Sequence, residues 1–340
     1  MDDRRRVRLP TRLHPARPPL TGLLVGRLLL LPVLVAVVTL VMFALAQRTP
    51  FDPVLATLGE RALTMDGPTL EAMRDRASDT GAVQQWAAWW GNALQGDLGV
   101  SSSQRSPVST VIAQRLPWTL GLMSAALVLA VLGGVLVGGL AGTRPGSWAD
   151  RAVGGGLLAT QAAPPFWVGL VAVWVFAVWL GWLPTGGATS PGSGSVEALD
   201  VLRHAVLPVL VLALSQLPWF GLVVRDATRD ALAGVPVRAG WARGIPTARL
   251  LRQHAVRPAL LPLVTVLGVR VPELITGAVL VETVFSWPGV ASATVDSALR
   301  LDFPLLAALT VLTTVLVVLG NLAADVAYRV VDPRVGRRDG

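Results

Sequence analysis

Five polar or ionisable side chains lie inside long apolar stretches of this sequence. Arg270, Glu273 and Glu282 fall within one stretch, and Asn321 and Asp325 fall within the last one. An ionised side chain at the centre of a bilayer costs roughly 2.5 to 3.5 kcal/mol on insertion scales. Arg270 and Glu273 are three positions apart, so they can pair along one helix face or line a polar passage. Asn321 and Asp325 are expected to hydrogen-bond between helices, with a gate as the alternative.

The composition excludes most enzyme chemistry. All 29 basic residues are arginine, cysteine is absent, and only three widely separated histidines occur. A P-loop lysine, a Schiff-base lysine, a thiol nucleophile and a disulfide are therefore impossible. We expect a protein that is not an enzyme and that binds no cofactor or metal itself. Its net charge of +8 comes from arginine blocks beside apolar segments, which argues against nucleic acid binding.

These polar residues must be positioned by membrane helices. A crossing needs roughly 20 predominantly apolar residues, and six segments qualify: Leu23–Ala46, Leu116–Ala141, Val153–Leu180, Ala205–Val224, Ala259–Val281 and Pro304–Val326. Pro164-Pro165 interrupts the third segment and predicts a kink or a short leading helix there. The expected fold class is all-α, a polytopic membrane protein with six transmembrane helices surrounded by lipid.

Arginine placement predicts the orientation. Arginines concentrate before the first segment, in the turn between the second and third, between the fourth and fifth, and after the sixth. The positive-inside rule puts these parts, including both termini, on the cytoplasmic side of a bacterial inner membrane. The predicted organisation is a basic cytoplasmic tail (1–22), the first transmembrane helix (23–46), a periplasmic segment (47–115), a core with five helices (116–328) containing a cytoplasmic loop (225–257), and a cytoplasmic tail (329–340).

The segment from residue 47 to 115 is predicted to be external and partly helical. Its six arginines are outnumbered by seven acidic residues, so its export does not violate the rule. The stretch Thr69–Leu94 has helical composition. Its three tryptophans, Trp86, Trp89 and Trp90, are expected to anchor at the membrane interface rather than to contact a substrate.

The loop between the fourth and fifth segments spans about 33 residues and is too long for a simple turn. It predicts two short helices, the first opened by Pro236 and closed by Gly244. The second begins after Pro246, with Thr247 as its N-cap. Small residues at Ala239, Gly240 and Ala242 would let the first helix enter a groove on another protein closely, which is the helix-in-groove mode of docking.

This loop also carries a family resemblance. The stretch RAGWARGIPTARLLRQHAVRPALLPLVTVLG resembles the cytoplasmic EAA loop of binding-protein-dependent ABC importer permeases of the oligopeptide/dipeptide branch. It departs from that pattern at Trp241, Arg243 and Pro258, and the bulky Trp241 bears on how tightly a partner groove can close. Other similar motifs are Gly96-Asp97-Leu98-Gly99, Gly146-Ser147-Trp148-Ala149-Asp150-Arg151, Glu282-Thr283-Val284-Phe285-Ser286-Trp287-Pro288-Gly289 and Asp332-Pro333-Arg334.

The resemblance implies a type I ABC importer permease fold and the role of the B-type membrane subunit. Such a subunit pairs with a homologous second permease, is driven by two ABC ATPase subunits that bind ATP and Mg, and receives substrate from an extracytoplasmic binding protein. The residues expected to couple to the ATPases are Val237, Arg238, Ala239, Ala242, Arg243, Gly244, His254 and Arg257.

The resemblance also suggests roles for the polar membrane residues. Glu282, in the E-T-V-F-S-W-P-G motif, is expected to brace the external gate. Arg270 and Glu273 either pair with each other or contact the termini of a zwitterionic peptide. Peptide is the favoured substrate; a metal chelate, glutathione or a saccharide is the alternative within the same importer class.

Two other classes compete with the importer. A proton-coupled secondary transporter would use Arg270, Glu273 and Asp325 as a relay, but the sequence has no detectable inverted repeat and such a carrier has no need of the docking loop. An intramembrane enzyme is disfavoured because no catalytic constellation converges on the membrane segments.

Overall fold

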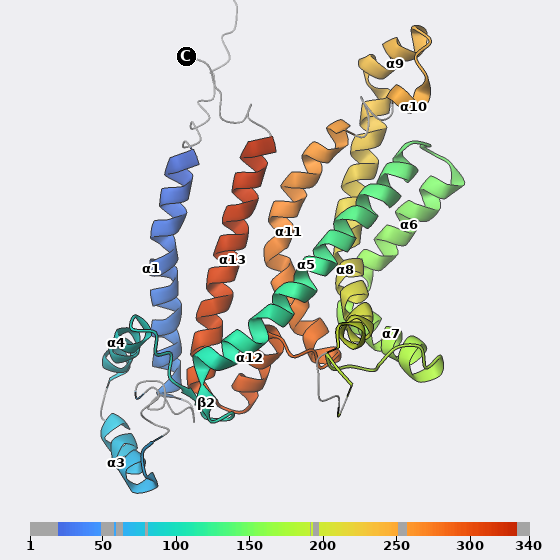
Figure 1. The fold of residues 1–340 in the computed structure, drawn as a ribbon. Coiled ribbons are helices and arrows are strands. Elements are labelled where there is room, and N and C mark those ends of the chain that lie inside the picture. The colour runs from blue at the N-terminus through green and yellow to red at the C-terminus, as the bar shows by residue number, and fades with distance from the viewer. Residues whose placement is uncertain are drawn as a thin grey trace, which may run out of the picture.

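The structure is a computed structural model that describes residues 20–48, 58, 64–78, 81–190, 192, 197–250 and 257–331. Five of its helices are long and apolar enough to cross a membrane. They are α1 (Leu20–Ala46), α5 (Val108–Gly142), α8 (Ala198–Ala233), α11 (Arg257–Val284) and α13 (Phe303–Val331). Figure 1 shows them as a tilted bundle in which the short helices gather at the two ends.

Several of these helices extend beyond the apolar segments predicted from the sequence. Helix α5 begins at Val108 rather than Leu116, although Ser109, Thr110 and Gln114 are polar. The added turns bury Val108 and Val111 against α12 (Val290–Leu299) and α13. Hydropathy detects only the part of a helix that lies in lipid, whereas backbone hydrogen bonds and packing carry the helix further.

The third predicted segment is two helices at a steep angle. Helices α6 (Trp148–Ala162) and α7 (Pro165–Ala172) meet at a bend of 101°, and a π-helical turn, η2 (Val173–Trp179), follows α7. The break follows from Pro164-Pro165, because a proline lacks a backbone donor and pushes the preceding residue to extended backbone. Ala163 accordingly has φ −79° and ψ 127°. The predicted kink is thus a full break.

Chain direction shows that this broken pair makes a crossing. In Figure 1, α5 runs toward the end of the bundle that carries α9 (Val235–Ala242), and α8 starts at the opposite end, beside α7. The chain must return between them. With 15 residues, α6 covers about 22 Å of this return at ~1.5 Å per residue, and α7 and η2 turn away from it by 101°. With the broken pair counted as one span, the crossings number six, as predicted.

The described residues between α1 and α5 form a small layer at the end of the bundle opposite α9 (Figure 1). It contains α3 (Gly67–Ser78), α4 (Ala82–Ala93) and a hairpin of β1 (Val100–Ser101) and β2 (Ser106–Pro107). The predicted helical content of Thr69–Leu94 is therefore confirmed. The backbone and side chains of the hairpin are held by the buried Asp302, which accepts hydrogen bonds from Ser101 Oγ (2.5 Å), Ser103 N (3.0 Å) and Ser103 Oγ (2.6 Å).

The three tryptophans of α4 hold this layer to the bundle. Trp89 is 1% exposed and lies against Phe43 of α1, which in turn packs edge-on against Phe303 of α13. Trp86 and Trp90 both donate to the buried Thr39 Oγ1, at 2.9 and 3.2 Å. The expectation that all three anchor at the membrane interface is wrong for Trp89, because its ring is enclosed by protein.

The centre of the bundle is the contact between α5 and α8. A Cβ added at Gly134 would lie 2.6 Å from Phe220 Cβ, and one at Gly142 would lie 2.6 Å from the Arg225 carbonyl oxygen. At Gly138 it would collide with the backbone of Gly221. The two helices therefore approach until their backbones touch, which small residues permit in membrane proteins.

Candidate functional site

The coupling loop folds as predicted where the structure describes it. Helix α9 has Pro236 in its first turn, and α10 (Thr247–Leu250) follows. Gly244 ends α9 with a φ of +74°, a conformation that favours glycine, and its N–H bonds to the Trp241 carbonyl at 2.9 Å. Thr247 is the first residue of α10 rather than the residue preceding it.

A small apolar cluster holds the two short helices to the end of α8. Val237 is fully buried with Leu232 and Leu250. Leu250 lies directly over Gly240, where an added Cβ would overlap its side chain, so the expectation that Gly240 belongs to the docking surface is wrong. Val237, grouped with the ATPase contacts from the sequence, thus forms the inner face of α9 and sets its position.

The outer face of α9 is exposed in the part of the chain that the structure describes. The remaining described members of the predicted coupling set are all exposed: Arg238, Ala239, Ala242, Arg243 and Gly244. Trp241, the departure from the family pattern, is 46% exposed on the same short helix. His254 lies outside the described residues, and Arg257 is described only by its backbone, as the first residue of α11. The exposed residues form a rigid, basic, small-residue surface.

An ion-pair network beside this loop was not predicted. Asp150, in the first turn of α6, is fully buried and accepts hydrogen bonds from Arg225 Nε at 2.7 Å and from Arg229 Nη2. Gly146 N also donates to it at 2.9 Å. Both arginines belong to the last turns of α8. The only sequence signal was the position of Asp150 within a family-like motif, which does not identify a partner 75 residues away.

Arg270 and Glu273 form an ion pair along one face of α11, as one of the two sequence hypotheses expected. The Arg270 guanidinium also lies over the ring of Trp219 in α8, with 3.4 Å between Cζ and the ring centroid. The Arg270 side chain is 12% exposed and that of Glu273 is 50% exposed. The carboxylate therefore reaches the surface of this chain at mid-membrane, while the guanidinium is covered by aromatic surface.

Glu282 sits at the corner where α11, α12 and α5 meet, at the end of the bundle opposite α9. It is 0% exposed; Thr119 Oγ1 donates to its Oε1 at 2.7 Å and Ser292 N donates to its Oε2 at 2.8 Å. Thr119 in turn accepts from Val290 N at 2.7 Å. The carboxylate is held by three elements of the corner and is not free to bind a solute.

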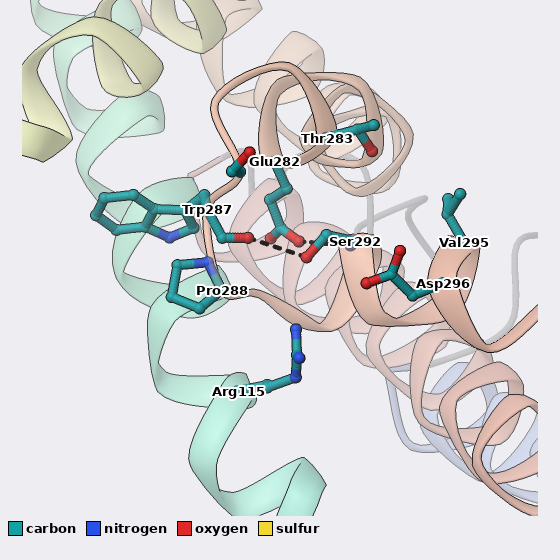
Figure 2. Close-up of a pocket in the computed structure, with 9 residues that line it drawn as sticks. Arg115, Glu282, Thr283, Trp287, Pro288, Ser292, Val295 and Asp296 are labelled. Carbon is teal, nitrogen blue, oxygen red and sulfur yellow. Dashed lines mark hydrogen bonds between the residues drawn. The ribbon is translucent and has the colours of Figure 1, made fainter. Parts of the chain in front are cut away.

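A pocket of about 290 Å³ opens beside this corner, and Figure 2 shows its walls. Arg115 of α5 and Asp296 of α12 point into the space from different elements. Its lining also includes Thr283, Trp287 and Ser292. The pocket has both polar and apolar walls and borders the segment containing Glu282, so a movement of α12 against α5 would change its shape.

The polar residues of α13 have different environments. Asp325 pairs with Arg27 of α1, with 2.6 Å between Oδ2 and Nη2. The expected interhelical contact of Asp325 is therefore an ion pair. Asn321 is half-buried, and the part of the chain that the structure describes gives its side chain no hydrogen bond.

Comparison with known proteins decides the family. Residues 134–337 match the family described as the binding-protein-dependent transport system inner membrane component. The chain belongs to this family. It is therefore a permease subunit of a binding-protein-dependent importer, a multi-pass protein of the inner membrane.

Relatives of this permease cover nearly its whole length. It is 36% identical over 314 residues to the oligopeptide transport system permease protein AppB of Bacillus subtilis, covering 91% of this chain and 96% of that protein. It is 35% identical to the di/tripeptide transport system permease protein DppB of Pseudomonas aeruginosa, with 88% and 94% covered. It is 33% identical to the dipeptide transport system permease protein DppB of Haemophilus influenzae, with 91% and 97% covered.

The fold of the permease is also found in a solved structure. An inward-facing crystal form of the MetNI methionine ABC transporter aligns with a TM-score of 0.53 and 18% identity, covering 66% of this chain and 97% of that chain. The likeness supports the type I permease fold predicted from the sequence. Family membership gives no support to the proton-coupled carrier considered as an alternative.

Proposed function

We propose that this permease forms half of a peptide pathway that is powered by separate ATPase subunits docked on α9. The exposed outer face of α9 carries the proposal, because an inward anchor at Val237 fixes the helix while Arg238, Ala239 and Ala242 remain available to a groove. Peptide as the substrate is supported by the names of the three relatives.

The end of the bundle that carries α9 is proposed to be cytoplasmic, together with both termini. Arginines concentrate there on the α5–α6 turn, the last turns of α8 and the coupling loop, at Arg144, Arg151, Arg225, Arg229, Arg238, Arg243 and Arg249. The positive-inside rule favours this orientation. The layer containing α4 and α12 then faces outward, toward an extracytoplasmic binding protein.

A second, homologous permease is proposed to complete the pathway. Glu273 is half exposed near the middle of α11, where lipid contact would be costly for a carboxylate. A water-filled passage between two permeases would remove that cost. The ion pair with Arg270 then becomes a polar patch on the pathway wall, where a peptide amino group can approach the half-exposed Glu273.

Replacing Ala239 and Ala242 by glutamate tests the docking. Both side chains are exposed and glutamate favours a helix, so α9 itself should persist. Ala298→Glu, on an exposed helical alanine of α12 at the opposite end, is the matched control. We expect ATPase subunits to copurify with the wild type and the control and to be lost from the double variant.

The second arm of this experiment is transport. In proteoliposomes, the assembled wild type should take up peptide only with ATP. If no ATPase copurifies with the wild type, and the chain alone drives peptide uptake with a proton gradient, the proposal is overturned. If the complex hydrolyses ATP with saccharide or a metal chelate but not with peptide, the importer role stands and the peptide assignment fails.

A further inference from the structure

The buried Asp150 joins two helices at the end of the bundle that carries the coupling loop. It lies on α6, and its carboxylate is held by Arg225 and Arg229 of α8. The turn before α6 adds two local bonds, from Gly146 N to the carboxylate (2.9 Å) and from Asp150 N to Ser147 Oγ (3.1 Å). The N-terminus of α6 is thereby tied both to its own turn and to α8.

Asp226 offers a contrast in the same place. It also approaches both arginines, at 3.3 Å from Arg225 and 3.8 Å from Arg229. It belongs to α8 itself, however, and its side chain is 62% exposed against 1% for Asp150. Ion pairs between exposed groups contribute little, whereas breaking a buried pair leaves uncompensated charge. Among the described acidic residues near these arginines, Asp150 alone bridges two helices.

The helices next to the ion pairs of Asp150 with Arg225 and Arg229 are closely packed. Gly221 of α8 touches α5 at Gly138 on one side and α6 at Leu157 on the other, where an added Cβ would lie 2.9 Å from Leu157 Cδ1. A Cβ at Gly154 of α6 would lie 3.1 Å from the Arg225 guanidinium. Close-packed interiors transmit displacement because they have no free volume to absorb it. Helices α5, α6 and α8 thus form one unit near the coupling loop.

The coupling loop is attached to this unit next to the bridge. Arg229 lies four residues before the end of α8 at Ala233, and α9 starts at Val235. Leu232, between these points, packs on Val237 and Leu250 of the loop. A force on α9 therefore reaches Arg229 within about one helical turn.

We propose that Asp150 is a positioning residue that transmits movement of the coupling loop to α6, and through it to the broken third span. The bend between α6 and α7 would then be displaced together with α8 when ATPase subunits move α9. This inference rests on the proposed docking at α9 but assigns a role to a residue outside the docking surface. It requires α6 and α9 to move as one body.

Asp150→Asn tests the inference in the assembled complex, with Asp226→Asn as its control. Both changes remove one carboxylate beside the same two arginines. Only Asp150→Asn removes the ion pairs that join α6 to α8. Coupling free energies between sites commonly correspond to roughly 5-fold to 150-fold effects. We expect the ATP consumed per peptide transported to rise at least about 5-fold for Asp150→Asn and to stay at the wild-type ratio for Asp226→Asn.

A merely structural role would lower ATP hydrolysis and transport together, with less complex recovered. That pattern, or an unchanged ratio in Asp150→Asn, overturns the inference while the proposed function survives. If wild type and Asp226→Asn also fail to couple ATP to transport, the proposed function itself falls.

A distance measurement keeps the inference falsifiable even if Asp150→Asn assembles poorly. The chain has no cysteine, so introduced cysteines at the exposed Trp148 of α6 and Val235 of α9 can carry spin labels attached before assembly. In the wild type we expect one narrow distance that is the same with and without bound ATP. A wild-type distance that changes between these two states would overturn the inference.

Discussion

Thr119 and Glu282, 163 positions apart, are joined by a buried hydrogen bond of 2.7 Å between α5 and α11. The same threonine oxygen accepts from the backbone N–H of Val290, and the second carboxylate oxygen accepts from that of Ser292. Gly289 adjoins this carboxylate so closely that no Cβ would fit there. The E-T-V-F-S-W-P-G motif therefore folds back on its own glutamate, and the corner between α5, α11 and α12 is built around one side chain.

Glu282→Gln is expected to destabilise this corner. An amide keeps one acceptor oxygen and replaces the other with an NH2 donor, so one of the two bonds from Thr119 and Ser292 is lost, and an unsatisfied buried group costs about 1 to 3 kcal/mol. Thermal unfolding in detergent measures the loss. Thr283→Ala, next in sequence but exposed and bonded within its own helix, should leave the unfolding temperature nearly unchanged. An unaltered unfolding temperature in Glu282→Gln would contradict the bracing role.

Asp302→Ala is expected to release the β1–β2 hairpin. The buried carboxylate receives donors from Ser101 and Ser103 and also from Leu305 N at the start of α13. Removing it leaves several buried donors without an acceptor, so we expect the free energy of unfolding to fall by at least about 2 kcal/mol. Limited proteolysis at the hairpin should speed up, whereas the exposed Asp296→Asn should be cut at the wild-type rate. Equal rates for both variants would count against the role of Asp302 in holding the hairpin.

Gly138→Ala tests the backbone contact between α5 and α8. The new methyl would collide with the Gly221 backbone, and overpacking of this kind costs about 1 to 3 kcal/mol. The neighbouring Gly139→Ala is the matched control, because the nearest atom to its methyl is 4.0 Å away. We expect Gly138→Ala to unfold at a clearly lower temperature than Gly139→Ala. Equal values would mean that the helices are less tightly packed than described.

Glu273→Gln tests the contact with substrate. If the carboxylate receives the amino group of a peptide, losing a charged hydrogen bond worth about 1.5 to 3 kcal/mol should reduce uptake of free peptides by roughly 10-fold or more. N-acetylated peptides lack that amino group and serve as the control substrate. The variant should lose the preference for the free form. An unchanged preference with unchanged uptake would leave Glu273 only as the partner of Arg270.

Structural features that depend on residues close together in the chain could be predicted from the sequence. Apolar runs gave the six crossings, Pro164-Pro165 marked the break of the third, and Pro236 and Gly244 marked the two ends of α9. Arg270 and Glu273 were near enough in sequence for their pairing to be considered. The helix ends outside the membrane were not readable, because polar turns such as the first of α5 carry no hydropathy signal.

By itself, the sequence determined the class of this protein: its composition required a membrane, and its motifs placed a docking loop between the fourth and fifth crossings. Only the tertiary structure decided which face of α9 is buried, that Trp89 is enclosed by protein, and that Asp150 meets Arg225 and Arg229. The physical reason is that helix formation depends on neighbours within a turn or two, whereas the partner of a buried charge depends on how distant helices pack.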